Sequence, residues 1–317
     1  MQLNAVTRKS ALLAIMLLVA ILVAAAIRSS LFPFEVELAD SEFRGRIISQ
    51  ILAIVLFLCC GIVDGKILPR SGLNKGYCTL PMPLYGILAC GVFVAPDALP
   101  AAIASLNFAI ALYLLLRSLH NADEKDSVFF ASILLGIAPL LCPPCVILVG
   151  VIPLSIFILA LSARQIVLMI VGYLLPLLGA SYIVWYKGGE IYEFGQNLYS
   201  ALMLPQMLSI ANIPYIAIAL VATIVAVLLW GGVYAIIRPD KMFLLSRVRR
   251  ALHLFLWVSL LSLGMFFMPA YNLSVCAVVA VPIAILLSFV LCILPNNHST
   301  IAYWVLLLLF VLHLFVA

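Results

Sequence analysis

Long apolar stretches follow one another along almost the whole chain, and they limit what it can fold into more than any other feature. The stretches 11–27, 47–63, 210–237 and 301–317 approach the ~20 apolar residues needed to cross a hydrocarbon core about 30 Å thick. Hydrophobic residues make up 67% of the chain and charged residues 9%. The polar segments between the apolar stretches, roughly two dozen residues at most, are too short to form a soluble domain. Residues 1–317 are therefore expected to form a single integral membrane domain.

The apolar stretches indicate helices. They are continuous and rich in Leu, Ile, Val and Ala, whereas the strands of a membrane barrel alternate in polarity over ~10 residues. We expect an all-α fold, a polytopic transmembrane helical bundle. Divided at charged clusters and prolines, the sequence has eleven expected spans: 10–28, 46–63, 80–95, 100–117, 128–142, 145–162, 165–186, 210–237, 251–269, 274–294 and 301–317.

The distribution of positive charge predicts the orientation of this bundle. With a cytoplasmic N-terminus, the eleven-span arrangement leaves four of the 17 Lys and Arg residues outside and 13 inside. The four outer cations are Arg28, Arg44, Arg46 and Lys187. Such asymmetry is typical of membrane proteins, whose cytoplasmic loops carry the excess of Lys and Arg. We therefore expect a multi-pass protein of the cell inner membrane with its N-terminus in the cytoplasm.

The first outer loop contains four of the twelve acidic residues. They are Glu35, Glu37, Asp40 and Glu42. In an extended segment, Glu35 and Glu37 would point to one side and the apolar residues between them to the other. Paired carboxylates can act as a catalytic base or bind a divalent cation, which is the one cofactor that the pattern suggests. Charge clusters near helix ends are more often simply solvated, so a solvated connector is the alternative.

A second cluster of charges lies between residues 238 and 250 and is basic. It contains five cations in thirteen residues: Arg238, Lys241, Arg247, Arg249 and Arg250. A basic inner rim suits anionic lipid headgroups, so membrane lipids are expected partners of this loop. No basic stripe with interleaved aromatic residues is present, and nucleic acid is not an expected partner.

Cys142-Pro143-Pro144-Cys145 is a C-x-x-C motif at an expected turn between two spans. Such spacing permits a redox disulfide or half of a metal site. Consecutive prolines also terminate one helix and begin the next. Because a metal site would need further ligands that the sequence does not supply, we interpret the motif as a structural turn.

The expected spans contain no Asp, Glu, Lys or Arg away from their ends. Ion-coupled transporters commonly use an intramembrane ionisable residue to bind the coupling ion. This absence argues against secondary transport, although sodium can also be bound by backbone carbonyls of broken helices.

Features of the first 185 residues resemble the membrane module of GT-C-type glycosyltransferases. They are an N-inside first span, the acidic connector after it, Arg117 at the end of the fourth span, and Gly136-Ile137-Ala138 leading to Pro143-Pro144. The chain also resembles Bacteroidota inner-membrane proteins of about this length. The resemblance implies a GT-C-like module over 1–186, additional spans over 187–317, and a catalytic role for one of Glu35, Glu37, Asp40 and Glu42.

The resemblance further implies transfer of sugar from a polyprenyl-phosphate-linked donor at the outer face of the membrane. This chain departs from the family in its very short first loop and its lack of a soluble outer domain. Two alternatives therefore stay open. One is a non-catalytic membrane subunit that binds other envelope proteins, and the other is a lipid or small-solute transporter.

Overall fold

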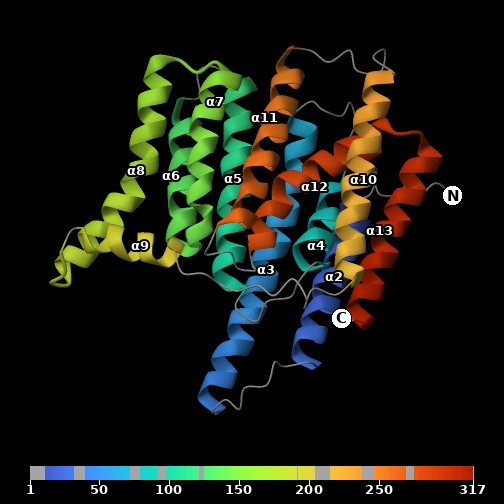
Figure 1. Ribbon diagram of the computed structural model, residues 1–317, viewed down its shortest axis with the longest axis horizontal. Coiled ribbons are helices and arrows are strands. Elements are labelled where there is room, and N and C mark those ends of the chain that lie inside the picture. The colour runs from blue at the N-terminus through green and yellow to red at the C-terminus, as the bar shows by residue number, and fades with distance from the viewer. Residues whose placement is uncertain are drawn as a thin grey trace.

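The computed structural model describes residues 11–31, 40–71, 79–91, 98–120, 125–190, 192–203, 215–237, 246–268 and 275–316. Within these ranges every regular element is a helix (Figure 1). The elements are α2 (Ala11–Leu31), α3 (Asp40–Arg70), α4 (Pro81–Gly91), α5 (Leu99–His120), α6 (Lys125–Leu141), η1 (Pro143–Gly150), α7 (Val151–Leu159), α8 (Ala163–Tyr186), α9 (Glu193–Met203), α10 (Tyr215–Ile237), α11 (Ser246–Leu263), η4 (Gly264–Phe267), α12 (Cys276–Ile293) and α13 (Asn296–Val316).

Six of the described helices are long and apolar enough to cross a membrane, which confirms the prediction of a helical membrane protein. They are Ile48–Pro69, Leu99–Ser118, Ala163–Tyr186, Val248–Phe267, Cys276–Ile293 and Asn297–Phe315. The shorter apolar helices are Ala11–Ala26, Pro81–Cys90, Asp126–Leu141, Pro143–Leu159 and Ile218–Val233. The number of eleven crossings and the cytoplasmic N-terminus stay predictions.

The predicted span 46–63 ends too early. Helix α3 continues to Arg70, and the candidate span runs to Pro69. Asp64 therefore lies inside a membrane-length helix, and it is fully buried. The prediction that the spans contain no internal charged residue is wrong here, because Asp64 and Lys66 both lie within this candidate span. The physical reason is that Ile67 and Leu68 after it are also buried, so the packed part of the helix extends past the charge.

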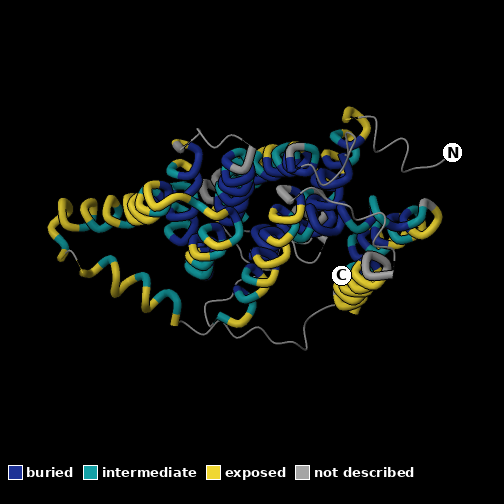
Figure 2. Tube along the Cα trace, turned by 90° about the horizontal axis from the view of Figure 1, so that it is seen from above, coloured by how far each residue is buried: buried dark blue, intermediate teal, exposed yellow. Residues whose placement is uncertain are grey.

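Helix α12 lies at the centre of the bundle. It packs against α3, α4, α5, α10 and α11, and fourteen of its residues are buried. Figure 2 shows the buried residues gathered in the middle of the molecule, while the helices at its left edge are largely exposed. A helix from the C-terminal part of the chain thus packs among helices from the N-terminal part. The predicted division into 1–186 and 187–317 stays a prediction.

Helix α4 is short and lies inside the bundle. Its eleven residues rise about 16 Å at 1.5 Å per residue, which is about half of a 30 Å hydrocarbon core. Every residue from Thr79 to Cys90 is buried, and α4 is packed against α2, α3, α12 and α13. The segment 80–95, which we expected to be a span, therefore provides a short helix surrounded by longer ones.

Helix α8 forms one side of the bundle in Figure 1 and is held there by α6. A Cβ atom at Gly172 of α8 would lie 2.8 Å from the carbonyl oxygen of Phe129 and would overlap the Ser132 side chain. Likewise, a Cβ atom at Gly136 of α6 would overlap the backbone of Tyr173. Small residues allow two membrane helices to approach this closely. The opposite face of α8 is exposed, as expected for a face that contacts lipid.

Candidate functional site

The four acidic residues of the first outer loop are divided between a segment outside the described residues and the start of α3. Glu35 and Glu37 lie outside the described residues. Asp40 and Glu42 belong to the first turn of α3. Among the described residues, no three His, Cys, Asp or Glu side chains come together in a way that could hold a metal ion. The catalytic role of Glu35, Glu37, Asp40 and Glu42 stays a prediction.

The basic cluster is only partly described. Arg238 and Lys241 lie outside the described residues, and Arg247 belongs to the first turn of α11. Arg249 and Arg250, also near the start of α11, are exposed. Exposed cations at the beginning of a membrane helix are consistent with a position near lipid headgroups.

The Cys142–Cys145 motif forms the expected turn. Helix α6 ends at Leu141, Cys142 is extended with φ −139° and ψ 101°, and Pro143 begins η1. Both thiols are buried and free, and they interact with each other. The prolines thus terminate one helix and start the next, as predicted.

Asp64 is the strongest candidate for a functional residue, and our sequence analysis missed it. Its side chain is fully buried, and neither carboxylate oxygen has a hydrogen-bond partner among the described residues. Lys66, two residues further on, is exposed, and positions two apart on a helix do not face each other. This lysine therefore does not provide a counter-ion for the carboxylate.

Three polar side chains from three helices form a connected group, and two of them, Cys60 and Tyr85, are neighbours of Asp64. Cys60 precedes it by one helical turn on the same face of α3, Tyr85 belongs to α4 and Ser105 to α5. The Tyr85 hydroxyl donates a hydrogen bond to Ser105 Oγ at 3.1 Å, and Ser105 Oγ donates to the carbonyl oxygen of Ala102 at 2.9 Å. The Cys60 thiol lies close to both hydroxyls, and Asp64 interacts electrostatically with Cys60 and Tyr85. We call Cys60, Asp64, Tyr85 and Ser105 the buried polar cluster.

The beginning of α4 offers Asp64 few donors, although α4 packs closely against α3. Pro81 and Pro83 have no N–H group. The N–H groups of Met82 and Leu84 already donate to the carbonyl oxygens of Thr79 and Leu80, at 3.3 Å each. The usual attraction between a helix N-terminus and an anion is therefore weakened here, because its donors are absent or occupied.

Glycines on α3 make this close packing possible. A Cβ atom at Gly61 would lie 2.6 Å from a side-chain carbon of Leu18 on α2 and 3.5 Å from the carbonyl oxygen of Met82 on α4. A Cβ atom at Gly65 would overlap the Met82 side chain. Gly61 and Gly65 form a G-x-x-x-G pair of the kind that lets membrane helices approach closely. They enclose Asp64 in a tightly packed junction of α2, α3 and α4.

The chemistry of this site follows from the isolation of one carboxyl group. A charged carboxylate buried without partners costs several kcal/mol relative to the same group in water. A proton that binds to one carboxylate oxygen of Asp64 removes this charge, and it needs no ligand from any other residue. A metal ion would need several ligands, and among the described residues no three His, Cys, Asp or Glu side chains come together in a way that could hold one. The arrangement therefore favours a proton-binding site.

One signal in the sequence could have identified this site. Asp64 interrupts an apolar run that continues through Ile67 and Leu68, and an ionisable residue within a membrane helix is a functional candidate by default. Because the predicted span 46–63 ended just before Asp64, this residue was assigned to a loop and was not considered as a site. No family model, curated protein or solved structure matches this chain, so a proposal about its function rests on these helices and side chains.

Proposed function

We propose that this protein is a multi-pass inner-membrane transporter of a small solute, in which Asp64 binds and releases the coupling proton. The observation that supports this proposal is the complete burial of Asp64 with no donor at either carboxylate oxygen among the described residues. Ionisable side chains inside membrane helices are costly, and they mark ion pathways and proton relays. The sequence argument against secondary transport depended on the absence of such a residue.

The position of the site next to α4 supports the same proposal. Transporters build ion sites from short or broken helices within the membrane, because such helices bring polar groups to mid-bundle without exposing them to lipid. Helix α4 is an eleven-residue helix surrounded by α2, α3, α12 and α13. We propose that the packing of α4 against α3 differs between the protonated and deprotonated states. A proton can shift such an equilibrium only if it binds one state more tightly than the other.

The test is a measurement of charge displacement, because it does not require the solute to be known. Proteoliposomes that contain the purified protein are adsorbed to a solid-supported membrane and exposed to a rapid pH jump. Proton binding at Asp64 should produce a transient current in the wild-type protein and none in Asp64→Asn. Asp126→Asn is a matched control, because Asp126 is an exposed acid in the first turn of α6 and its removal should leave the current unchanged.

The possible results separate the hypotheses. If the Asp64→Asn variant still produces the transient current after a pH jump, the proposed role of Asp64 is contradicted. A current produced by a Na⁺ jump at constant pH, and not by a pH jump, would replace the proton with a sodium ion. Absence of any current in a folded wild-type protein would argue against ion coupling and favour a non-catalytic membrane subunit of an envelope assembly.

Sugar transfer from a lipid-linked donor is a second proposal, and it rests on the GT-C resemblance alone. The acidic residues of the first outer loop, which this second proposal requires, do not share a site with Asp64. Asp40 and Asp64 are separated by about 36 Å along α3 at 1.5 Å per residue. If one acid of the first outer loop is the catalytic base, its amide variant should abolish transfer from a polyprenyl-phosphate sugar. Asp64→Asn should leave this sugar transfer unchanged. Activity that persists after combined replacement of Glu35, Glu37, Asp40 and Glu42 by amides would refute this proposal.

A further inference from the structure

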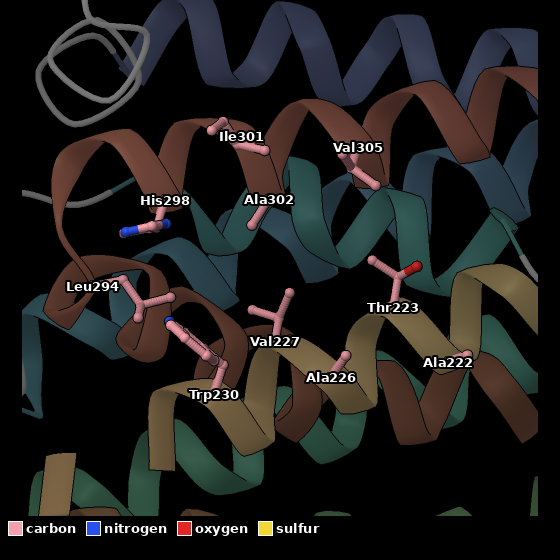
Figure 3. A pocket seen from close by; sticks show the side chains of 10 residues that line it. All are labelled: Ala222, Thr223, Ala226, Val227, Trp230, Leu294, His298, Ile301, Ala302 and Val305. Carbon is pink, nitrogen blue, oxygen red and sulfur yellow. The ribbon is translucent and has the colours of Figure 1, made fainter. Parts of the chain in front are cut away.

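A groove between α10 and α13 is a second feature that could bind a ligand (Figure 3). It has a volume of about 580 Å³. Its walls consist mainly of small and branched apolar side chains: Ala222, Ala226 and Val227 of α10 and Ile301, Ala302 and Val305 of α13. Four of these side chains, Ala222, Ala226, Ile301 and Val305, are exposed. The groove therefore opens to the outside of the bundle, where the surrounding solvent is lipid.

The polar groups of this groove are concentrated at one end. Thr223 lies toward the other end, and its hydroxyl donates to the carbonyl oxygen of Ala219 at 2.8 Å, so it is already satisfied within α10. Trp230 and His298 lie together at the polar end (Figure 3), with ring centroids 6.2 Å apart. Both side chains are exposed. The groove is thus apolar along its length and ends at two rings whose N–H groups can donate hydrogen bonds.

The polar end of the groove lies at the basic edge of the protein. Trp230 is two helical turns before the end of α10, and the neighbouring Gly231 is packed against Val290, close to the end of α12. Helix α11 begins at the same edge, because it is the next helix after α10 and antiparallel to it in Figure 1. Its first turns expose Arg249 and Arg250. Tryptophan is enriched at the membrane interface, which agrees with a headgroup-level position for this end.

We propose that the groove binds one acyl chain of an anionic phospholipid from the bilayer, with the lipid phosphate at the Trp230–His298 end. The length fits, since Ala222 to Trp230 spans about 12 Å of helix and one leaflet of the hydrocarbon core is about 15 Å thick. The apolar walls accept the acyl chain. The N–H groups of Trp230 and His298, together with the exposed Arg249 and Arg250 at the start of α11, favour a negative headgroup over a zwitterionic one. This site is independent of Asp64 and of the proposed transport function.

Quenching of tryptophan fluorescence by brominated lipids tests this proposal on the full-length protein. The chain has four tryptophans. Replacing Trp185, Trp257 and Trp304 by Phe leaves Trp230 as the only one. The matched control retains only Trp257, because Trp257 is 51% exposed and Trp230 is 56% exposed. Each protein is placed in vesicles of phosphatidylcholine that contain the same fraction of either brominated phosphatidylglycerol or brominated phosphatidylcholine.

We expect Trp230 to be quenched with an apparent affinity about fivefold higher for phosphatidylglycerol, the factor expected for one additional contact between a cation and an anionic lipid. Trp257 should show no preference. His298→Ala should reduce the preference, and Ala226→Leu, which fills the groove, should remove it. Equal quenching of Trp230 by both lipids would overturn the proposal. The same preference at Trp257 would also overturn it, because it would indicate general enrichment of anionic lipid around the protein.

Discussion

The Tyr85 hydroxyl donates its hydrogen bond to Ser105 Oγ at 3.1 Å, and not to the Asp64 carboxylate, with which Tyr85 interacts electrostatically. Two hydroxyls from α4 and α5 are therefore satisfied, while a carboxyl group from α3 in the same buried polar cluster has no donor among the described residues. Because buried polar groups in proteins are nearly always hydrogen-bonded, the proposed role of Asp64 rests on this unpartnered carboxyl group.

Asp64→Asn should not destabilise the protein. The variant keeps the shape of the side chain and removes a charge that has no partner to lose, and functional residues are often retained at a cost in stability. We expect an apparent melting temperature in detergent equal to or above that of the wild type, measured by differential scanning fluorimetry. A buried carboxylate with a structural partner behaves differently, because its removal costs about 3–5 kcal/mol. A decrease of that size would show that Asp64 is paired after all.

Tyr85→Phe and Ser105→Ala should each destabilise the bundle, and their effects should not be additive. Both remove the hydrogen bond between α4 and α5, so we expect a coupling free energy of about 0.5–1.5 kcal/mol in a double-mutant cycle. Unfolding in mixed detergent micelles would provide the free energies. Ser118→Ala is the control for Ser105, because Ser118 is also a buried serine of α5, and its hydroxyl donates to Leu115 of its own helix at 2.7 Å. Additive effects of Tyr85→Phe and Ser105→Ala would mean that the hydrogen bond contributes nothing.

Two glycines of α8 should respond oppositely to alanine. At Gly172 a Cβ atom would be 2.8 Å from the carbonyl oxygen of Phe129, so Gly172→Ala should push α8 away from α6 and cost about 1–3 kcal/mol. At Gly179 nothing lies within 4 Å of the added atom. Gly179→Ala should be neutral or stabilising by up to about 1 kcal/mol, since alanine favours the helix. Equal effects at both positions, measured by thermal unfolding, would refute the close contact between α6 and α8.

The double replacement of Cys142 and Cys145 by Ser should preserve folding and the charge displacement caused by a pH jump. The two thiols are buried and belong to a turn whose geometry comes from Pro143 and Pro144. Serine is nearly the same size, and its hydroxyls can replace the interaction between the thiols. Loss of the current at a normal amount of folded protein would indicate that the dithiol is a redox centre.

Much of the helical structure could be predicted from local sequence. Apolar runs of the right length predicted a helical membrane protein, and the pair Pro143–Pro144 predicted the end of α6, because backbone constraints of proline act within one turn. The position of Asp64 was predictable in part, since it interrupts an apolar run. Its isolation was not, because that depends on where Tyr85 and Ser105 direct their hydroxyls.

The sequence by itself determined that the chain forms apolar helices of membrane length, because length and hydropathy are local properties that the bilayer imposes on each segment separately. Only the tertiary structure decided which faces of those helices are buried. Lipid and the protein interior are both apolar, so an apolar residue such as Leu84 on buried α4 and one such as Val171 on exposed α8 satisfy the same local pattern. The enclosure of Asp64 and the groove between α10 and α13 arise from helix packing, which in a membrane depends on steric fit rather than on hydropathy.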